Sequence, residues 1–223
     1  MKYQNIVPAT FLARPNRFIA TVEVDGQAAV AHVKNTGRCQ ELLVPGAQVY
    51  LYESSNPQRK TKYDLIAVYK GDMLVNMDSQ VVNDVAEEYL RRVYPQAKIR
   101  REVTYKASRF DFYIENGEDK IFIEAKGVTL ENEGVVSFPD APTERGVKHV
   151  NELISAKKEG YLCGILFIIQ MKNVKYFTPN DERHPAFGEA LRQARAQGVS
   201  VTAVSCRVTP DTIVPYNEVE VHL

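Results

Sequence analysis

Residues 108–130 carry the pattern that decides the fold of this chain, and they read Ser108-Arg-Phe-Asp-Phe-Tyr-Ile-Glu-Asn-Gly-Glu-Asp-Lys-Ile-Phe-Ile-Glu-Ala-Lys-Gly-Val-Thr-Leu130. Apolar and polar residues alternate up to Ile114 and again from Ile121, and this alternation predicts two β-strands. The dipeptide Asn116-Gly117 between them predicts a two-residue hairpin loop. We therefore expect an antiparallel hairpin.

The register of this hairpin determines which polar side chains lie together. With Asn116 and Gly117 as the loop residues, Asp111 and Glu124 become diagonal neighbours on one face of the sheet, with backbones roughly 7–8 Å apart. Lys126 follows on the same face. A shift of the register by two residues keeps this arrangement, whereas a shift by one residue places the two carboxylates on opposite faces.

Two carboxylates and a lysine on one sheet face suit metal-dependent hydrolysis of a phosphodiester. Hard oxygen ligands hold Mg2+ or Mn2+ and leave positions for water, so that the ion activates a nucleophilic water and stabilises charge in the transition state. The pattern resembles the Asp…Glu-x-Lys signature of the PD-(D/E)xK nuclease superfamily, with Asp111, Glu124 and Lys126 in the matching places. An ion pair between Arg109 and Glu124, with Asp111 in solvent, explains the same residues without a catalytic role.

The overall charge gives no indication of a nucleic-acid partner. Lys and Arg together number 28 and so do Asp and Glu, so any such binding must rest on local patches. One basic stretch leads into the hairpin and contains a single acidic residue, Glu102. It is explained either as a phosphate-binding patch or as a solvated helix end and strand, and its cations are Arg91, Arg92, Lys98, Arg100, Arg101, Lys106 and Arg109.

Cysteine usage and hydropathy predict a cytoplasmic protein. Cys39, Cys163 and Cys206 are odd in number, far apart and without a Cys-x-x-Cys pair, which indicates neither a disulfide framework nor a structural zinc site. Residues 1–8 lack the apolar core of a signal peptide, and the longest apolar run, residues 161–169, is too short to span a bilayer. We therefore expect neither export nor membrane insertion.

The first eighty residues predict a small barrel. Alternating residues indicate strands between Ala9 and Lys34 with a hairpin loop at Asp25-Gly26. Further strands are expected at residues 48–53, 63–69 and 73–77, with a brief helical turn near residues 39–43. About five short strands in this length are typical of an OB-like barrel, which we place at residues 1–80.

A polar loop at residues 32–38 leaves one of these strands. Its Asn35-Thr36-Gly37 segment needs no function beyond the geometry of a turn. Barrels of this class commonly bind strands of nucleic acid, however, and His32, Asn35 and Arg38 then supply phosphate or base contacts. Both interpretations fit the loop.

Residues 81–223 predict an α/β domain. Helices are expected at residues 81–94 and 185–197, and residues 138–149 are expected to open a further helix that runs to about residue 159. Strands are expected at 98–106, in the hairpin, at 161–170 and at 199–208. Residues 161–170 are nearly all apolar and predict a central buried strand, and residues 211–223 predict an edge strand. Glu87 and Glu88 of the first helix are expected to be ordinary surface residues.

Arg145 and His149 fall on one side of the second predicted helix, opposite its apolar stripe. Such a pair either faces a phosphate or belongs to a solvated helix face with an exposed histidine.

Taken together, these fragments resemble the sugar fermentation stimulation protein family, SfsA. The resemblance covers both halves of the chain and rests on Arg17-Phe18, His32…Asn35-Thr36-Gly37, residues 108–112, residues 124–130, Phe138-Pro139-Asp140-Ala141, Thr143-Glu144-Arg145-Gly146 and Lys148-His149. It implies an OB-like domain, a restriction-endonuclease-like mixed-sheet α/β domain of the PD-(D/E)xK type, DNA binding and a regulatory link to sugar (maltose) metabolism. A backbone carbonyl beside Glu124 is then a candidate third metal ligand.

Two functions follow from these expectations. In the first, the chain is a Mg2+- or Mn2+-dependent nuclease in which Asp111 and Glu124 hold the ion, Lys126 positions the attacking water, and Arg17, His32, Asn35, Arg38, Arg145 and His149 contact DNA. In the second, it is a non-cleaving and largely sequence-independent DNA-binding regulator, because a nuclease fold can lose turnover. The sequence predicts neither the oligomeric state nor which of the two functions holds.

Overall fold

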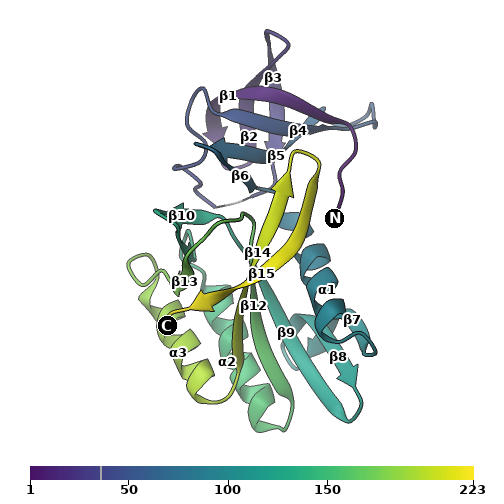
Figure 1. The fold of residues 1–223 in the computed structure, drawn as a ribbon, viewed down its shortest axis with the longest axis vertical. Coiled ribbons are helices and arrows are strands. Elements are labelled where there is room, and N and C mark those ends of the chain that lie inside the picture. The colour runs from purple at the N-terminus through teal and green to yellow at the C-terminus, as the bar shows by residue number, and fades with distance from the viewer. Residues whose placement is uncertain (36) are drawn as a thin grey trace.

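A computed structural model describes residues 1–35 and 37–223 and arranges them around two β-sheets, with the first above the second in Figure 1. Within these residues the first sheet consists of β1 (Ile6–Asn16), β2 (Ile19–Val24), β3 (Gln27–Val33), β4 (Gln48–Glu53), β5 (Tyr63–Lys70) and β6 (Met73–Asn76). The second consists of β7 (Lys98–Tyr105), β8 (Ser108–Asn116), β9 (Asp119–Val128), β10 (Leu130–Asn132), β11 (Val135–Phe138), β12 (Leu162–Ile169), β13 (Tyr176–Pro179), β14 (Ser200–Thr209) and β15 (Thr212–Val221).

The first sheet closes into a barrel because β3 pairs with β5 as well as with β2. Going round the barrel, the strands follow the order β1, β2, β3, β5, β4 and back to β1. The predicted hairpin at Asp25-Gly26 is confirmed, since Val24 pairs with Gln27 and both loop residues have positive φ angles, 49° and 76°, as a type I′ turn requires. The predicted OB-like barrel is confirmed.

The second sheet is mixed and has helices on both faces, as predicted. Its centre is parallel, with β12 between β9 and β14, and residues 163–169 of β12 are all buried. A 3-10 helix (Ser79–Val81) leads into α1 (Val82–Val93), which packs on one face, while α2 (Glu144–Lys158) and α3 (Pro185–Ala196) pack on the other. None of the helices in residues 1–35 and 37–223 has the length and apolar character needed to cross a bilayer.

The register of the β8–β9 hairpin differs from the prediction by two residues. Asn116 pairs with Asp119, so the loop consists of Gly117 and Glu118 rather than Asn116 and Gly117. Gly117 has a φ of 62° at the first loop position, the position and sign that a type II′ turn requires, and this preference outweighs that of Asn-Gly for a type I′ turn. A shift of two residues preserves the alternation of faces.

The predicted edge position of the last strand is wrong. β15 pairs with β14 on one side and with β13 on the other, because β13, β11 and β10 continue the sheet beyond it. These three strands were not predicted. Each has only three or four residues, which is too short for an alternating pattern to be recognised.

The chain returns to the barrel side of the molecule through the β14–β15 hairpin, drawn in yellow in Figure 1. The loop of this hairpin holds the segment that precedes β1: Tyr3 donates its backbone N–H to the carbonyl of Asp211 at 2.8 Å, and Lys2 forms a β-bridge with Thr212. The first residues of the chain therefore lie against the α/β domain rather than against the barrel.

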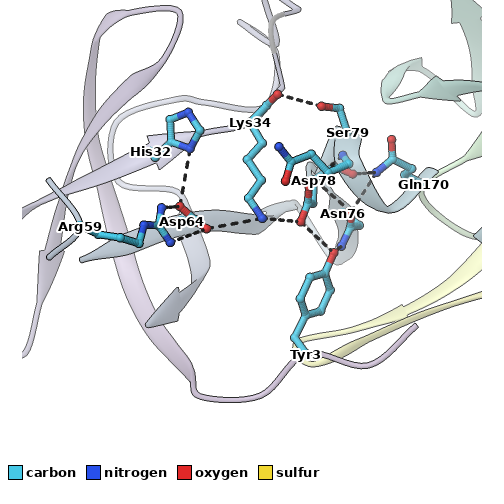
Figure 2. A network of polar contacts seen from close by, with 10 residues as sticks. Tyr3, His32, Lys34, Arg59, Asp64, Asn76, Asp78, Ser79 and Gln170 are labelled. Carbon is cyan, nitrogen blue, oxygen red and sulfur yellow. Dashed lines mark hydrogen bonds and ion pairs between the residues drawn. The ribbon is translucent and has the colours of Figure 1, made fainter. Parts of the chain in front are cut away.

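A network of buried polar side chains connects the two domains (Figure 2). Lys34 Nζ lies 3.4 Å from Asp64 Oδ2 and 3.0 Å from Asp78 Oδ2, so one ammonium joins a barrel strand to the segment that follows β6. Gln170, which follows β12, donates to Asn76 Oδ1 at 2.8 Å and to the Asp78 carbonyl at 3.0 Å. Asp64, Asp78, Asn76 and Gln170 are all at most 3% exposed. The network fixes the barrel relative to the second sheet.

Candidate active site

A cavity of about 650 Å³ lies where the barrel meets the α/β domain, and both domains line it. The α/β domain contributes residues of α1, β8, β9, α2 and the loop between β11 and α2, and the barrel domain contributes Asn35 and Gly37. The three predicted catalytic residues, Asp111, Glu124 and Lys126, all line this cavity.

Glu124 is 3% exposed and lies in the middle of β9, where it is opposite Ile165 of β12. Its Oε1 accepts a hydrogen bond from Lys126 Nζ at 2.5 Å and contacts His149 Nδ1. Burial alone would raise the pKa of Glu124, but the hydrogen bond from His149 and the charge of Lys126 outweigh it and lower the pKa. Glu124 is therefore held as a carboxylate.

The second oxygen of Glu124 has no hydrogen-bond partner. Four buried side-chain atoms in the described part of the chain lack one, and Glu124 Oε2 is the one among them that belongs to a residue lining the cavity. A buried acceptor without a donor costs about 1–3 kcal/mol, and more when it is charged. An acceptor left open beside a cavity is available to a ligand.

Asp111 lies where β8 separates from β9. The paired segment of the two strands ends at Phe112 and Ile123, and beyond it Asp111 Oδ2 accepts the backbone N–H of Ala125 at 2.9 Å. Its Oδ1 accepts from Asn83 Nδ2 of α1 at 3.1 Å. Burial raises the pKa of Asp111, and the charge of Glu124 raises it further. The two carboxylates thus repel each other across one cavity, and a bound cation would relieve this repulsion.

His149 and Arg145 are brought together as the helical pattern predicted, with Arg145 Nε 3.4 Å from His149 Nε2. The exposed histidine that one interpretation expected is wrong, because α2 packs over the sheet and leaves His149 only 5% exposed. With Nε2 facing a donor, Nδ1 carries the proton toward Glu124, a tautomer assigned from the contacts. Both residues line the cavity.

The alternative ion pair between Arg109 and Glu124 does not form. Arg109 contacts Glu102 Oε2 at 2.6 Å instead. The other cations of the basic stretch before the hairpin are paired in the same way, which favours its interpretation as a solvated helix end and strand over a phosphate-binding patch. Each of its seven cations contacts a carboxylate, and the partners are Asp84, Glu87, Glu88, Glu102, Glu115 and Glu159.

The barrel loop reaches the cavity through two contacts. Asn35 Nδ2 donates to Thr129 Oγ1 at 3.4 Å, and Cys39 donates its backbone N–H to Asp140 Oδ2 at 3.0 Å. Between them Gly37 approaches so closely that a Cβ atom would lie 2.7 Å from Asp140 Oδ2. Thr36, the middle residue of the predicted turn, lies outside the described residues.

The remaining predicted DNA contacts lie in two different places. Arg17 and Arg38 are exposed and flank the barrel loop. The guanidinium of Arg14 links them by donating hydrogen bonds to their carbonyl oxygens, at 2.8 Å for Arg17 and 2.7 Å for Arg38. His32 instead belongs to the interdomain network, with Nδ1 3.6 Å from Asp64 Oδ1 (Figure 2). Among the six predicted DNA contacts, His32 is therefore the one whose side chain faces Asp64 of the interdomain network.

Several residues of the site were not identified from the sequence. Asn83 holds Asp111, Asp140 holds the barrel loop, and Gln170 closes the cavity beside Gly127, where a Cβ atom would lie 2.7 Å from Gln170 Oε1. Gln170 had a usable signal, because it is a polar residue at the end of an otherwise apolar strand. Asp140 lies in one of the fragments that carry the family resemblance, but nothing in that fragment indicated a contact with the barrel loop, and Asn83 had no signal beyond its place in a helix start.

Within the described residues, no group of three or more His, Cys, Asp or Glu side chains is arranged to hold a metal ion. Asp111 and Glu124 supply a pair of neighbouring carboxylates in the cavity, while Asp140, which also lines it, accepts the backbone N–H of Cys39. Mg2+ is commonly bound through one or two carboxylates while several waters complete its coordination, so a pair is a sufficient protein contribution.

The fold and the site define a class of two-domain proteins, in which an OB barrel closes over a carboxylate-lined cavity of a mixed α/β sheet. Residues 12–77 match the family model described as the SfsA N-terminal OB domain, and residues 78–212 match the sugar fermentation stimulation protein RE domain. The chain belongs to the sugar fermentation stimulation protein family, SfsA.

Relatives from several organisms extend this likeness over nearly the full length. The sugar fermentation stimulation protein homolog of Desulfitobacterium hafniense is 59% identical over 215 residues, which cover 96% of this chain and 94% of that protein. The homolog of Clostridium beijerinckii is 56% identical over 216 residues, covering 96% of each chain. The solved structure of Pyrococcus furiosus SfsA in complex with Ca2+ is 28% identical, with a TM-score of 0.89 over 100% of this chain and 98% of that one.

Proposed function

We propose that this protein binds DNA and hydrolyses its phosphodiester bonds with the help of a divalent cation, Mg2+ or Mn2+. The observation that carries the proposal is the convergence of Asp111, Glu124 and Lys126 on one cavity, with Glu124 Oε2 buried and unpartnered in the described part of the chain. The arrangement has the composition of a PD-(D/E)xK nuclease site.

The residues present fit a divalent cation. Asp111 and Glu124 would hold it, because they are hard oxygen ligands, repel each other in a desolvated site, and include an acceptor that lacks a donor. When bound, such an ion stabilises negative charge on the phosphodiester and makes water a better nucleophile. The Ca2+ in the Pyrococcus furiosus relative supports a hard-cation site in this family.

The other residues have roles that follow from their contacts. Lys126 is bonded to Glu124, and its ammonium lies at the cavity, where it can hold a water or a phosphate oxygen. His149 acts through Glu124, whose orientation it fixes from α2. Arg145 lines the cavity without a carboxylate partner among the described residues, so its charge is available to a DNA phosphate.

The second candidate is a DNA-binding regulator of sugar metabolism that does not cleave. It is favoured by the name of the relatives and by one feature of the site: both oxygens of Asp111 already accept hydrogen bonds from protein donors. In this case the carboxylates are inherited parts of the scaffold.

The test is incubation of the purified protein with single-stranded, duplex and branched DNA in Mg2+ and in Mn2+. Asp111→Ala and Lys126→Ala are compared with Asp119→Ala and Lys120→Ala, which change exposed residues of the same β8–β9 hairpin. Cleavage that needs the metal, disappears in the first two variants and persists in the controls supports the nuclease. Binding without cleavage on every substrate overturns it in favour of the regulator.

A further inference from the structure

An exposed aromatic ring and an arginine lie together on the barrel, outside the residues that line the cavity. Phe18 is 48% exposed, and the guanidinium of Arg17 lies 5.3 Å from the centre of its ring. The backbone beneath the ring is fixed, because Phe18 donates its N–H to Asn16 Oδ1 at 2.9 Å and its carbonyl accepts from Val33 at 2.7 Å. The ring is therefore presented to solvent by a rigid turn.

This turn and the rim of the cavity are held by one side chain. The guanidinium of Arg14 donates to the carbonyl of Arg17 at 2.8 Å and also to the carbonyls of Asn35, Gly37 and Arg38, at 2.8, 2.9 and 2.7 Å. Asn35 and Gly37 line the carboxylate cavity. Arg14 thus ties the backbone of Arg38 and of Arg17, which precedes Phe18, directly to the rim of the cavity.

The charges of Arg17 and Arg38, beside this rim, are available to a ligand. Within residues 1–35 and 37–223, neither Arg17 nor Arg38 has a carboxylate within 4 Å, and both are exposed. The seven cations of residues 91–109, in contrast, all contact carboxylates. Unpaired arginines beside an exposed ring suit a polymer that alternates phosphates with flat, apolar rings.

We propose that Arg17, Phe18 and Arg38 bind an unpaired segment of DNA, with a base stacked on Phe18 and phosphates on the two arginines. In a duplex both faces of each base are covered by its neighbours, so a protein ring stacks only on a base that is unpaired or unstacked. The inference rests on the proposed function and narrows its substrate to DNA that carries a single-stranded segment, which runs from the barrel into the carboxylate cavity.

The molecule contains a matched control for this site. Tyr216 of β15 is 49% exposed and has the guanidinium of Arg207 4.8 Å from its ring centre, so it has the same local composition as Phe18 and Arg17. Tyr216 does not line the carboxylate cavity, and it belongs to the α/β domain. Substitution of Tyr216 therefore measures the effect of losing an exposed aromatic ring that lies outside the proposed DNA-binding site.

The experiment measures binding in EDTA, where metal-dependent cleavage does not contribute. The probes are a labelled single strand of about 12 nucleotides, within the site size of one OB domain, and the duplex of the same sequence. We expect Phe18→Ala to weaken binding of the single strand roughly tenfold and binding of the duplex less than about twofold, while Tyr216→Ala changes neither. Equal losses on both probes, or no loss on the single strand, would overturn the proposal.

A second variant gives a direct reading of stacking. The chain contains no tryptophan, so Phe18→Trp and Tyr216→Trp each introduce a single tryptophan, whose fluorescence can be excited selectively. The single strand should quench the first and leave the second unchanged, and the reverse result would overturn the proposal. Quenching without any metal-dependent cleavage would reject the nuclease and keep this binding site. Metal-dependent cleavage with no effect of Phe18→Ala on binding would keep the nuclease and reject this binding site.

Discussion

The interdomain network and the carboxylate cavity are both built on buried acidic pairs, but they differ in how completely those acids are hydrogen-bonded. In the network, Asp64 contacts Arg59, Lys34 and His32, and Asp78 contacts Lys34 and the hydroxyl of Tyr3. In the cavity, Glu124 keeps one oxygen without a partner among the described residues. A saturated cluster holds the fold together, whereas an unsaturated one beside a cavity is prepared for a ligand.

The largest effect is expected when the cation that Asp64 and Asp78 share, Lys34, is removed from the saturated cluster. Lys34→Met leaves Asp78, whose side chain is 2% exposed, without a cation, and we expect a loss of about 3–5 kcal/mol in the free energy of unfolding, measured with denaturant. Lys62→Met is the control, because its partner Glu53 is at the surface and the expected loss is below about 1 kcal/mol. Equal losses in the two variants would contradict the structural role of the network.

The unsaturated cluster should respond to a cation instead. Ca2+ at about 100 times its Kd should raise the free energy of unfolding by about 2.7 kcal/mol. Asp111→Asn should abolish this increase without destabilising the metal-free protein, because it removes one of two repelling charges and keeps an acceptor for Ala125 or Asn83. Thermal unfolding with and without Ca2+ measures both effects. An increase that survives Asp111→Asn would place the ion elsewhere.

The saturated carboxylates should also make the free energy of unfolding depend on pH. Burial alone would raise the pKa of Asp64, but the hydrogen bond from Arg59 and the charge of Lys34 lower it below its ordinary value. A lowered folded-state pKa contributes stability that is present above about pH 4 and is lost as the pH falls through the folded pKa. The unfolding free energy of Asp64→Asn, measured from pH 7 to pH 3, should therefore be lower at pH 7 and fall less steeply on acidification. Parallel pH profiles would contradict this assignment.

The smallest expected effects distinguish paired from unpaired arginines at the surface. Arg145→Ala should reduce the slope of log K against log salt for duplex DNA by about 0.9, since one phosphate contact is lost. Arg91→Ala should leave the slope unchanged, because Arg91 is already paired with Glu87 at 2.5 Å. Binding titrations at several salt concentrations provide the measurement, and a changed slope in Arg91→Ala would show that the basic stretch does contact DNA.

The fold was predictable where local patterns are long. Alternation marked most strands of the barrel, and the apolar run of β12 identified the centre of the second sheet. The prediction failed where tertiary pairing decides: β15 became an inner strand because three very short strands, without a readable pattern, added themselves beyond it. The hairpin loop moved by one residue, which shifted the pairing register by two, because Gly117 was preferred at the first loop position.

The part of the site that lies on one hairpin could be predicted from the spacing of its residues. Asp111, Glu124 and Lys126 could be grouped by period and register alone. The burial of His149 could not, because it depends on how α2 packs over β9. The pairing of the cations in residues 91–109 could not either, because their carboxylate partners include Glu115 and Glu159 on other elements. Charge counted along the chain is a poor guide to charge at the surface when partners come from other elements.

The attachment of Tyr3 to the β14–β15 loop has a consequence for synthesis on the ribosome. The barrel strands are complete by Asn76, but the backbone of Tyr3 finds its partner only when Asp211 has emerged. The segment before β1 must therefore wait for more than half of the chain, and a contact of such long sequence separation forms late and slows folding. We therefore expect the barrel strands to pair before the segment that precedes β1 is attached to the second domain.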